Sequence, residues 1–82
     1  MGKEVGFGNR DRIIELGLVM AAVRKMQGMS QEKLAEKAQV SRSHLSAIEA
    51  PNIVRAFSVE VLYNIADALG VKAGDLLNYT FL

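Results

Sequence analysis

The sequence predicts an all-α fold, a compact bundle of five short helices, and three observations lead to this prediction. Apolar residues recur at helical spacing along most of the 82 residues. Serine precedes three of these apolar segments, where it can cap a helix, and glycine or proline follows three of them. No stretch alternates apolar and polar residues for long enough to form a competing strand. The length allows one domain.

The first helix is expected from about Arg10 to Gln27. One face of this segment carries residues spaced three or four apart, namely Ile13, Leu16, Met20, Val23 and Gln27. Gly28 is well suited to end this helix. Gly17 lies inside the helix, where glycine lowers helix stability by about 1 kcal/mol relative to alanine, and it therefore indicates a close contact with another helix. Residues 1–9 contain three glycines and no helical period, so we expect a mobile N-terminal arm.

The first helix is apolar on nearly every side, because its second face also carries Leu18, Val19, Ala21 and Ala22. A helix of this kind is usually buried. We expect one face to be covered by another subunit, by the arm, or by the C-terminal tail (residues 79–82) with its apolar side chains Tyr79, Phe81 and Leu82. The apolar loop residues Ile53, Val54 and Phe57 are another candidate interface, and a homodimer through some of these surfaces is the resulting hypothesis.

Two short helices are expected next. Ser30 can cap the segment QEKLAEKA, whose inner face is formed by Leu34, Ala35 and Ala38. After a short connection, Ser41 can cap the segment RSHLSAIE, whose buried pair is Leu45 and Ile48. Pro51 cannot continue a helix, so the third helix should end close to it.

A loop over residues 51–57 leads to a fourth helix capped by Ser58. The segment VEVLYNIADAL has one apolar face, formed by Val59, Leu62, Ile65, Ala66 and Leu69. Gly70 ends it, and a short fifth helix, at about residues 72–78, should contribute Leu76 and Leu77. The folded domain is therefore expected over residues 10–78.

Composition excludes several classes of protein. Without cysteine and with a single histidine, the chain can form neither a disulfide framework nor the usual zinc site, and nothing indicates a cofactor or a small-molecule ligand. No run of 18 apolar residues predicts a membrane span, and no secretory signal is present, so we expect a cytoplasmic protein. Ser41, Ser43 and His44 are neighbours on one helix, not a nucleophile and base from separate elements, so we expect no enzyme.

Charge is distributed unevenly along the chain. Residues 24–55 carry six basic and three acidic side chains, whereas residues 56–82 carry one basic and three acidic side chains. A basic middle next to an acidic end weakly favours a polyanionic partner on one face of the molecule, although a solvated mixed surface fits the charges equally well.

The second and third helices, joined by about three residues and with the small Ala35 at their crossing, predict a helix-turn-helix. Inward packing of Val40, Leu45 and Ile48 leaves an outer face of short side chains and one arginine, formed by Arg42, Ser43, His44, Ser46 and Ala47. Such a face suits the major groove of DNA, where arginine can bind guanine with about 1–3 kcal/mol of discrimination.

The segment MSQEKLAEKAQVSRSHLSAIE, Met29 to Glu49, resembles the helix-turn-helix of the lambda-repressor-like family, which includes Cro, phage repressors and XRE-type regulators. The likeness continues into LVMAAVRKMQG upstream and ADALGVKAGDLL downstream, over about residues 16–77. The resemblance implies a five-helix bundle whose third helix, at about residues 41–49, reads double-stranded DNA. It also implies a homodimer that binds a two-fold symmetric operator.

The resemblance also assigns roles to individual residues. Arg42, Ser43 and Ala47 match base-contacting positions, and the methyl group of Ala47 could touch a thymine methyl. A further set of residues matches family positions whose side chains contact the DNA backbone, namely Gln31, Ser41, His44 and Arg55. Gln31 would also brace the first base-reading side chain.

A structural ion pair is implied between Arg24 and Glu49, joining the first helix to the end of the third. Two departures from the family pattern matter. Gln39 occupies a turn position that is often glycine, where a positive φ would be strained by roughly 1 kcal/mol. The loop before the fourth helix is longer than usual and offers only Arg55 to phosphates.

Two functions follow from this pattern. The first is a sequence-specific DNA-binding transcriptional regulator. The alternative is a protein-interaction module, such as an antitoxin or adaptor, built on the same fold. A long disordered toxin-wrapping segment would favour the alternative, and the sequence contains none.

Overall fold

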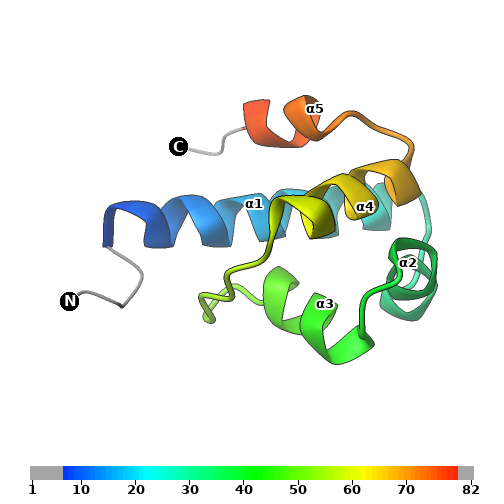
Figure 1. Cartoon of the computed structure of the whole chain (residues 1–82), viewed down its shortest axis with the longest axis horizontal. Helices are drawn as coiled ribbons and strands as arrows, with labels where there is room; N and C mark the ends of the chain where they lie inside the picture. The colour runs from blue at the N-terminus through cyan, green and yellow to red at the C-terminus, as the bar shows by residue number, and fades with distance from the viewer. Residues whose placement is uncertain (1–6, 80–82) are drawn as a thin grey trace.

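The structure is a computed structural model that describes residues 7–79 (Figure 1). Within this range the chain forms five helices and no strand, which confirms the predicted all-α class. The helices are α1 (Phe7–Met26), α2 (Gln31–Ala38), α3 (Arg42–Glu49), α4 (Val59–Leu69) and α5 (Ala73–Asn78). The expected start of α1 at about Arg10 was wrong, because residues 7–9, assigned to the arm, continue the helix. The rest of the arm lies outside the described residues.

The long helix α1 is the element on which the bundle is assembled. It contacts α3, α4 and α5, while α2 packs against both α3 and α4. Figure 1 shows α3 and α5 on opposite sides of the layer formed by α1 and α4. The outer side of α3 is therefore left uncovered by the other helices in this view.

The core is apolar and continuous across all five helices. Its largest fully buried side chains are Met20, Leu34, Leu45, Ile65, Leu76 and Val19. No buried side-chain nitrogen or oxygen atom of the described residues lacks a hydrogen-bond partner, which is the normal condition for polar groups removed from water.

Three serines cap helices as predicted. The hydroxyl oxygens of Ser30, Ser41 and Ser58 accept hydrogen bonds from the third backbone N–H of α2, α3 and α4, at 3.0, 3.0 and 3.1 Å. Each bond satisfies a donor that the first turn of the helix leaves free, and replacing such a cap by alanine typically costs about 1 kcal/mol. Helix starts are therefore encoded locally.

Two residues assigned to the core are in fact exposed. Val59 is 63% exposed because it is the first residue of α4, and Leu62, three residues later, is the first buried side chain of that helix. Leu77 is 58% exposed, because in the short helix α5 only its neighbour Leu76 is buried. Neighbouring positions on a helix point in different directions, so only one of the two leucines can face the core.

The apolar second face of α1 is partly covered by the chain itself. Val19 and Ala21 are buried within the single chain, so these two side chains need no cover from another subunit, the arm or the tail. Leu18 and Ala22 are only half-buried, and a cover over them stays a prediction. In the apolar loop, Phe57 is half-buried against the core and Ile53 remains 48% exposed. Tyr79 is also exposed. The other tail residues proposed as a cover, Phe81 and Leu82, lie outside the described residues.

The turn between α2 and α3 depends on a left-handed residue. Gln39 has φ 59° and ψ 41°, and it is the one residue other than glycine with positive φ in the described chain. Its N–H donates to the carbonyl of Glu36, and the N–H of Val40 donates to that of Ala35 at 3.0 Å. This geometry ends α2 and turns the chain into α3.

Replacing Gln39 with glycine should therefore stabilise the protein. We expect Gln39→Gly to raise the free energy of unfolding by about 0.5–1 kcal/mol, because glycine adopts positive φ without steric strain. Urea denaturation followed by circular dichroism measures this difference. Lys37→Gly, in the regular part of α2, is the matched control and should lower stability by about 1 kcal/mol. A loss of stability in Gln39→Gly would show that the side chain makes a contact worth more than the strain.

Candidate nucleic-acid interface

The first turn of α3 presents its polar side chains to solvent. Arg42 and Ser43 are exposed there, and Ala47 is half-buried one turn later. Leu45 and Ile48, on the opposite side of the helix, are fully or almost fully buried. The predicted base-contacting residues Arg42 and Ser43 are thus presented by a helix whose inner side is fixed in the core.

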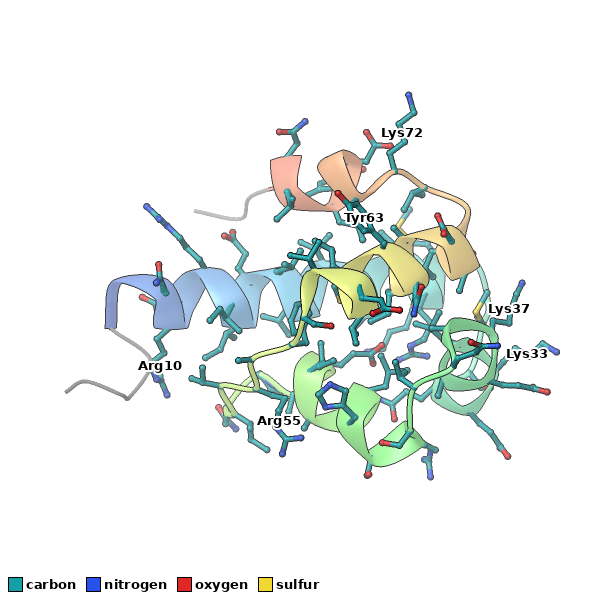
Figure 2. All side chains as sticks on the ribbon, in the orientation of Figure 1. Arg10, Lys33, Lys37, Arg55, Tyr63 and Lys72 are labelled. Carbon is teal, nitrogen blue, oxygen red and sulfur yellow. The ribbon has the colours of Figure 1, made fainter. Side chains whose placement is uncertain are left out.

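Two of the predicted backbone-contacting residues meet beside α3. A side-chain nitrogen of Arg55, Nη1, lies 3.3 Å from Nδ1 of His44, although Arg55 belongs to the loop before α4. Figure 2 shows Arg55 on the same side of the molecule as α3. The hydroxyl of Ser41 is occupied as the helix cap and also lies 3.4 Å from the hydroxyl of Ser43.

The implied ion pair between Arg24 and Glu49 is present and buried. Nε and Nη2 of Arg24 donate to the two carboxylate oxygens of Glu49, each at 2.9 Å. Nη1 of Arg24 donates to the carbonyl of Met29 at 2.7 Å. Arg24 and Glu49 are only 7% and 6% exposed, so both charges are removed from water and compensate each other.

Gln31 joins the helix-turn-helix to this ion pair. Its amide nitrogen donates to Oε1 of Glu49 at 2.8 Å, and the residue is half-buried at the start of α2. The same carboxylate therefore receives hydrogen bonds from α1 and from α2. Gln31 remains partly accessible, as the implied contact with a phosphate requires.

The resemblance implied the contact between Arg24 and Glu49, but sequence reasoning did not identify the other two contacts. The bond from Gln31 to Glu49 spans 18 residues, and the contact between His44 and Arg55 spans 11 residues. Neither spacing follows a helical or strand period, so no local pattern could have revealed the pairs.

Positive charge surrounds the outer side of the helix-turn-helix. Arg42 and Arg55 are exposed beside α3. Lys33 and Lys37 extend from the exposed side of α2 at one end of the molecule (Figure 2). Lys33 has an acidic neighbour, Glu36, at 3.8 Å, but both side chains are exposed and this pair contributes little. A surface with this excess of positive charge attracts a polyanion.

Two other classes of site find no support in the part of the chain that the structure describes. Residues 7–79 contain no group of three or more histidine, cysteine, aspartate or glutamate side chains placed to hold a metal ion. No helix in this range has the length and apolar character needed to cross a membrane.

Comparison with known families decides the affiliation. The family model described as "Helix-turn-helix" matches residues 20–76, which include the whole of α2, the turn and α3. The chain belongs to the XRE-type helix-turn-helix family. This is a family of DNA-binding regulators and not a class of enzymes.

Solved structures of other XRE-type regulators agree with this affiliation. The DNA complex of SinR, the master regulator for biofilm formation, has 36% identity and a TM-score of 0.70, covering 77% of this chain and 98% of that one. The restriction-modification controller protein C.AhdI from Aeromonas hydrophila has 26% identity and a TM-score of 0.73, with coverages of 78% and 94%. C.Esp1396I, solved with a 19 base pair DNA duplex, has 29% identity and a TM-score of 0.71, with coverages of 79% and 84%. A search of the curated proteins gave no match.

Proposed function

We propose that this protein is a transcriptional regulator that binds a two-fold symmetric DNA operator as a homodimer, with α3 in the major groove of each half-site. The observation that carries the proposal is the exposed first turn of α3, with Arg42 and Ser43 on a helix held at its other end by the buried Arg24–Glu49 pair. A reading helix must be held rigidly, because contacts to base edges depend on its position and angle. The DNA complexes of SinR and C.Esp1396I support the same type of ligand.

The proposed roles follow from exposure and position. Arg42 would contact a guanine, with Ser43 and Ala47 contacting neighbouring bases. Gln31, Ser41, His44 and Arg55 surround this turn and would contact phosphates, which position the protein on DNA without reading its sequence. A bacterial or phage regulator of this kind works in the cytoplasm and needs no cofactor.

A binding selection from random duplex DNA tests the proposal directly. The wild type should enrich a palindromic sequence, and Arg42→Ala should lose the preference for one guanine in each half-site while keeping its other preferences. The loss corresponds to about 1–3 kcal/mol at that position, or roughly tenfold to a hundredfold in affinity. Lys72→Ala is the matched control, because it removes one positive charge on the opposite side of the molecule from α3 (Figure 2).

The alternative function makes the opposite prediction. If no sequence is enriched even at low salt, the DNA-binding proposal fails, and the exposed side of α3 would have to be examined for a protein partner. Light scattering at micromolar concentration tests the dimer separately. A stable monomer in solution, both free and at saturation with duplex DNA, would contradict the homodimer.

A further inference from the structure

One side of α1 is left open by the other described helices. Gly17 and Arg24 lie on the side that faces α3. Gln27 lies on the side that faces α4, where its amide nitrogen donates to the carbonyl of Leu69 at 2.7 Å. Val23 lines a groove between α1 and α5. These contacts occupy three sides of the helix and leave a fourth.

The open side carries an apolar stripe with one charged residue at each end. Successive residues of a helix are turned by about 100°, so Asp11, Ile14, Leu18, Ala22 and Lys25 share the side that is turned away from α4. We call these five residues the outer face of α1. The three apolar side chains are half-buried, and the two charged side chains are exposed.

The outer face is complementary to a reversed copy of itself. Asp11 and Lys25 each lie seven positions from Leu18, and Ile14 and Ala22 each lie four positions from it. Two α1 helices placed antiparallel, with a two-fold axis at Leu18, therefore bring Asp11 opposite Lys25 of the partner subunit. They also bring the large Ile14 opposite the small Ala22 of the partner subunit. A two-fold interface requires this kind of pairing, in which residue i contacts residue j and j contacts i.

The charges select the antiparallel orientation of the two helices. A parallel pair would bring Asp11 against Asp11 of the partner subunit and Lys25 against Lys25 of the partner subunit, and like charges at close range repel each other. Within one chain, Asp11 lies 4.0 Å from its exposed neighbour Arg10, and its side chain is still 76% exposed. Such an exposed contact contributes little, so the carboxylate remains accessible to a partner.

The position of α3 gives a second, independent argument for the same orientation. Figure 1 shows α1 running horizontally, with α3 on one side, α5 on the other and α4 in front. When two α1 helices pair antiparallel on the side away from α4, the two-fold axis runs from the α5 side to the α3 side. Both α3 helices then lie on the same side of the dimer, as binding to one palindromic duplex requires. A parallel pair would put them on opposite sides.

We propose that the outer face of α1 is the surface through which two copies of this chain form the homodimer, with the two α1 helices antiparallel about Leu18. One side of α1 then belongs to the core of its own chain, and the other side covers the same helix of the second copy. This accounts for a helix that is apolar on nearly every side. The inference rests on the proposed DNA-binding homodimer and assigns its interface.

Reversing the charges tests the proposed pairing of Asp11 with Lys25. The two-fold axis repeats each contact, so Asp11→Lys alters two ion pairs and should raise the dimer dissociation constant about tenfold. Lys25→Asp should do the same. The double variant restores opposite charges and should return the dissociation constant to near the wild-type value, a recovery that a change in helix stability would not produce. Glu60→Lys, in the exposed first turn of α4, is the matched control and should leave the dimer unchanged.

Two measurements report the effect of these charge reversals. Sedimentation velocity at micromolar concentration gives the dissociation constant of the free protein. Fluorescence anisotropy with the palindrome enriched in the selection gives the cooperativity with which its two half-sites are filled. Thermal denaturation of each variant shows whether the fold is retained.

Cross-linking tests the position of the two-fold axis. The chain contains no cysteine, so Leu18→Cys introduces a single thiol, which the axis should bring close to its copy in the partner subunit. A short bismaleimide should therefore join two chains of this variant. Leu77→Cys, at a position on α5 that is 58% exposed, is the matched control and should remain uncoupled.

The possible outcomes separate this interface from the proposed function. A dimer unchanged by both single charge reversals, or Leu18→Cys joined no faster than Leu77→Cys, would overturn the inference and leave the DNA-binding homodimer intact. The outer face would then be covered by the arm or the tail, or left to solvent. A wild type that is monomeric both free and on saturated duplex would overturn the homodimer and its interface together, while enrichment of a DNA sequence would still decide the DNA-binding function.

Discussion

Replacing Glu49 with glutamine is expected to lower the free energy of unfolding by about 3–5 kcal/mol, because the change leaves the buried charge of Arg24 without its counter-charge. Arg24 and Glu49 are joined by two hydrogen bonds of 2.9 Å, and both are more than nine-tenths buried. Small domains typically unfold with about 5–15 kcal/mol in total, so the variant should be close to unfolding at ambient temperature. Urea denaturation monitored by circular dichroism measures the difference.

Two control variants show whether the loss comes from the buried charge. Glu36→Gln removes a carboxylate from the exposed pair with Lys33, whose atoms are 3.8 Å apart, and should change stability by less than about 1 kcal/mol. The double variant Arg24→Met with Glu49→Leu removes both buried charges and should recover most of the loss. If Glu49→Gln were no more harmful than Glu36→Gln, the pair would not be an energetic link between α1 and α3.

Replacing Gly17 with alanine is expected to lower the free energy of unfolding by about 3 kcal/mol, the upper end for an overpacked contact. A Cβ atom on Gly17 would overlap the carbonyl oxygen of Ile48 and lie 2.9 Å from its carbonyl carbon. This carbonyl belongs to the backbone of α3, so the clash can be relieved only by moving α3 away from α1. The change should therefore weaken DNA binding as well as stability.

Gly74→Ala is the matched control for this substitution. Gly74 also lies in a helix, α5, but nothing stands within 4 Å of a Cβ atom built there. Alanine favours the helix over glycine by about 1 kcal/mol, so this variant should be slightly more stable than the wild type. If the Gly17→Ala variant were as stable as the Gly74→Ala variant, α1 and α3 could move apart without lowering the free energy of unfolding, which would contradict this prediction.

The sequence was most informative where structure is decided by near neighbours. Ser30, Ser41 and Ser58 were recognised as helix caps, and all three form the expected bond. Gly17 was expected to mark a close helix contact, and the carbonyl of Ile48 is the group it approaches. The strained turn at Gln39 was expected on condition of a positive φ, which the structure shows. Each of these signals depends on one residue type at one position.

Prediction was weaker where the outcome depends on how helices are placed relative to one another. Val59 and Leu77 have the right character for a core, but the arrangement of α4 and α5 leaves them exposed. Nothing in the spacing of Gln31 and Glu49, or of His44 and Arg55, indicates that they touch. The roles of these residues toward DNA remain predictions.

The attachment of α3 is uneven along its length, and this has a consequence for how such proteins can diverge. Its close contacts with α1 lie at its carboxyl end, where the carbonyl of Ile48 approaches Gly17 and Glu49 forms an ion pair with Arg24. At its amino end, Arg42 and Ser43 are exposed, and the cap is provided by Ser41. Mutations at these two exposed positions can therefore accumulate with little effect on folding, and under the proposed function they would let descendants of one ancestral gene acquire new operators while inheriting an unchanged scaffold.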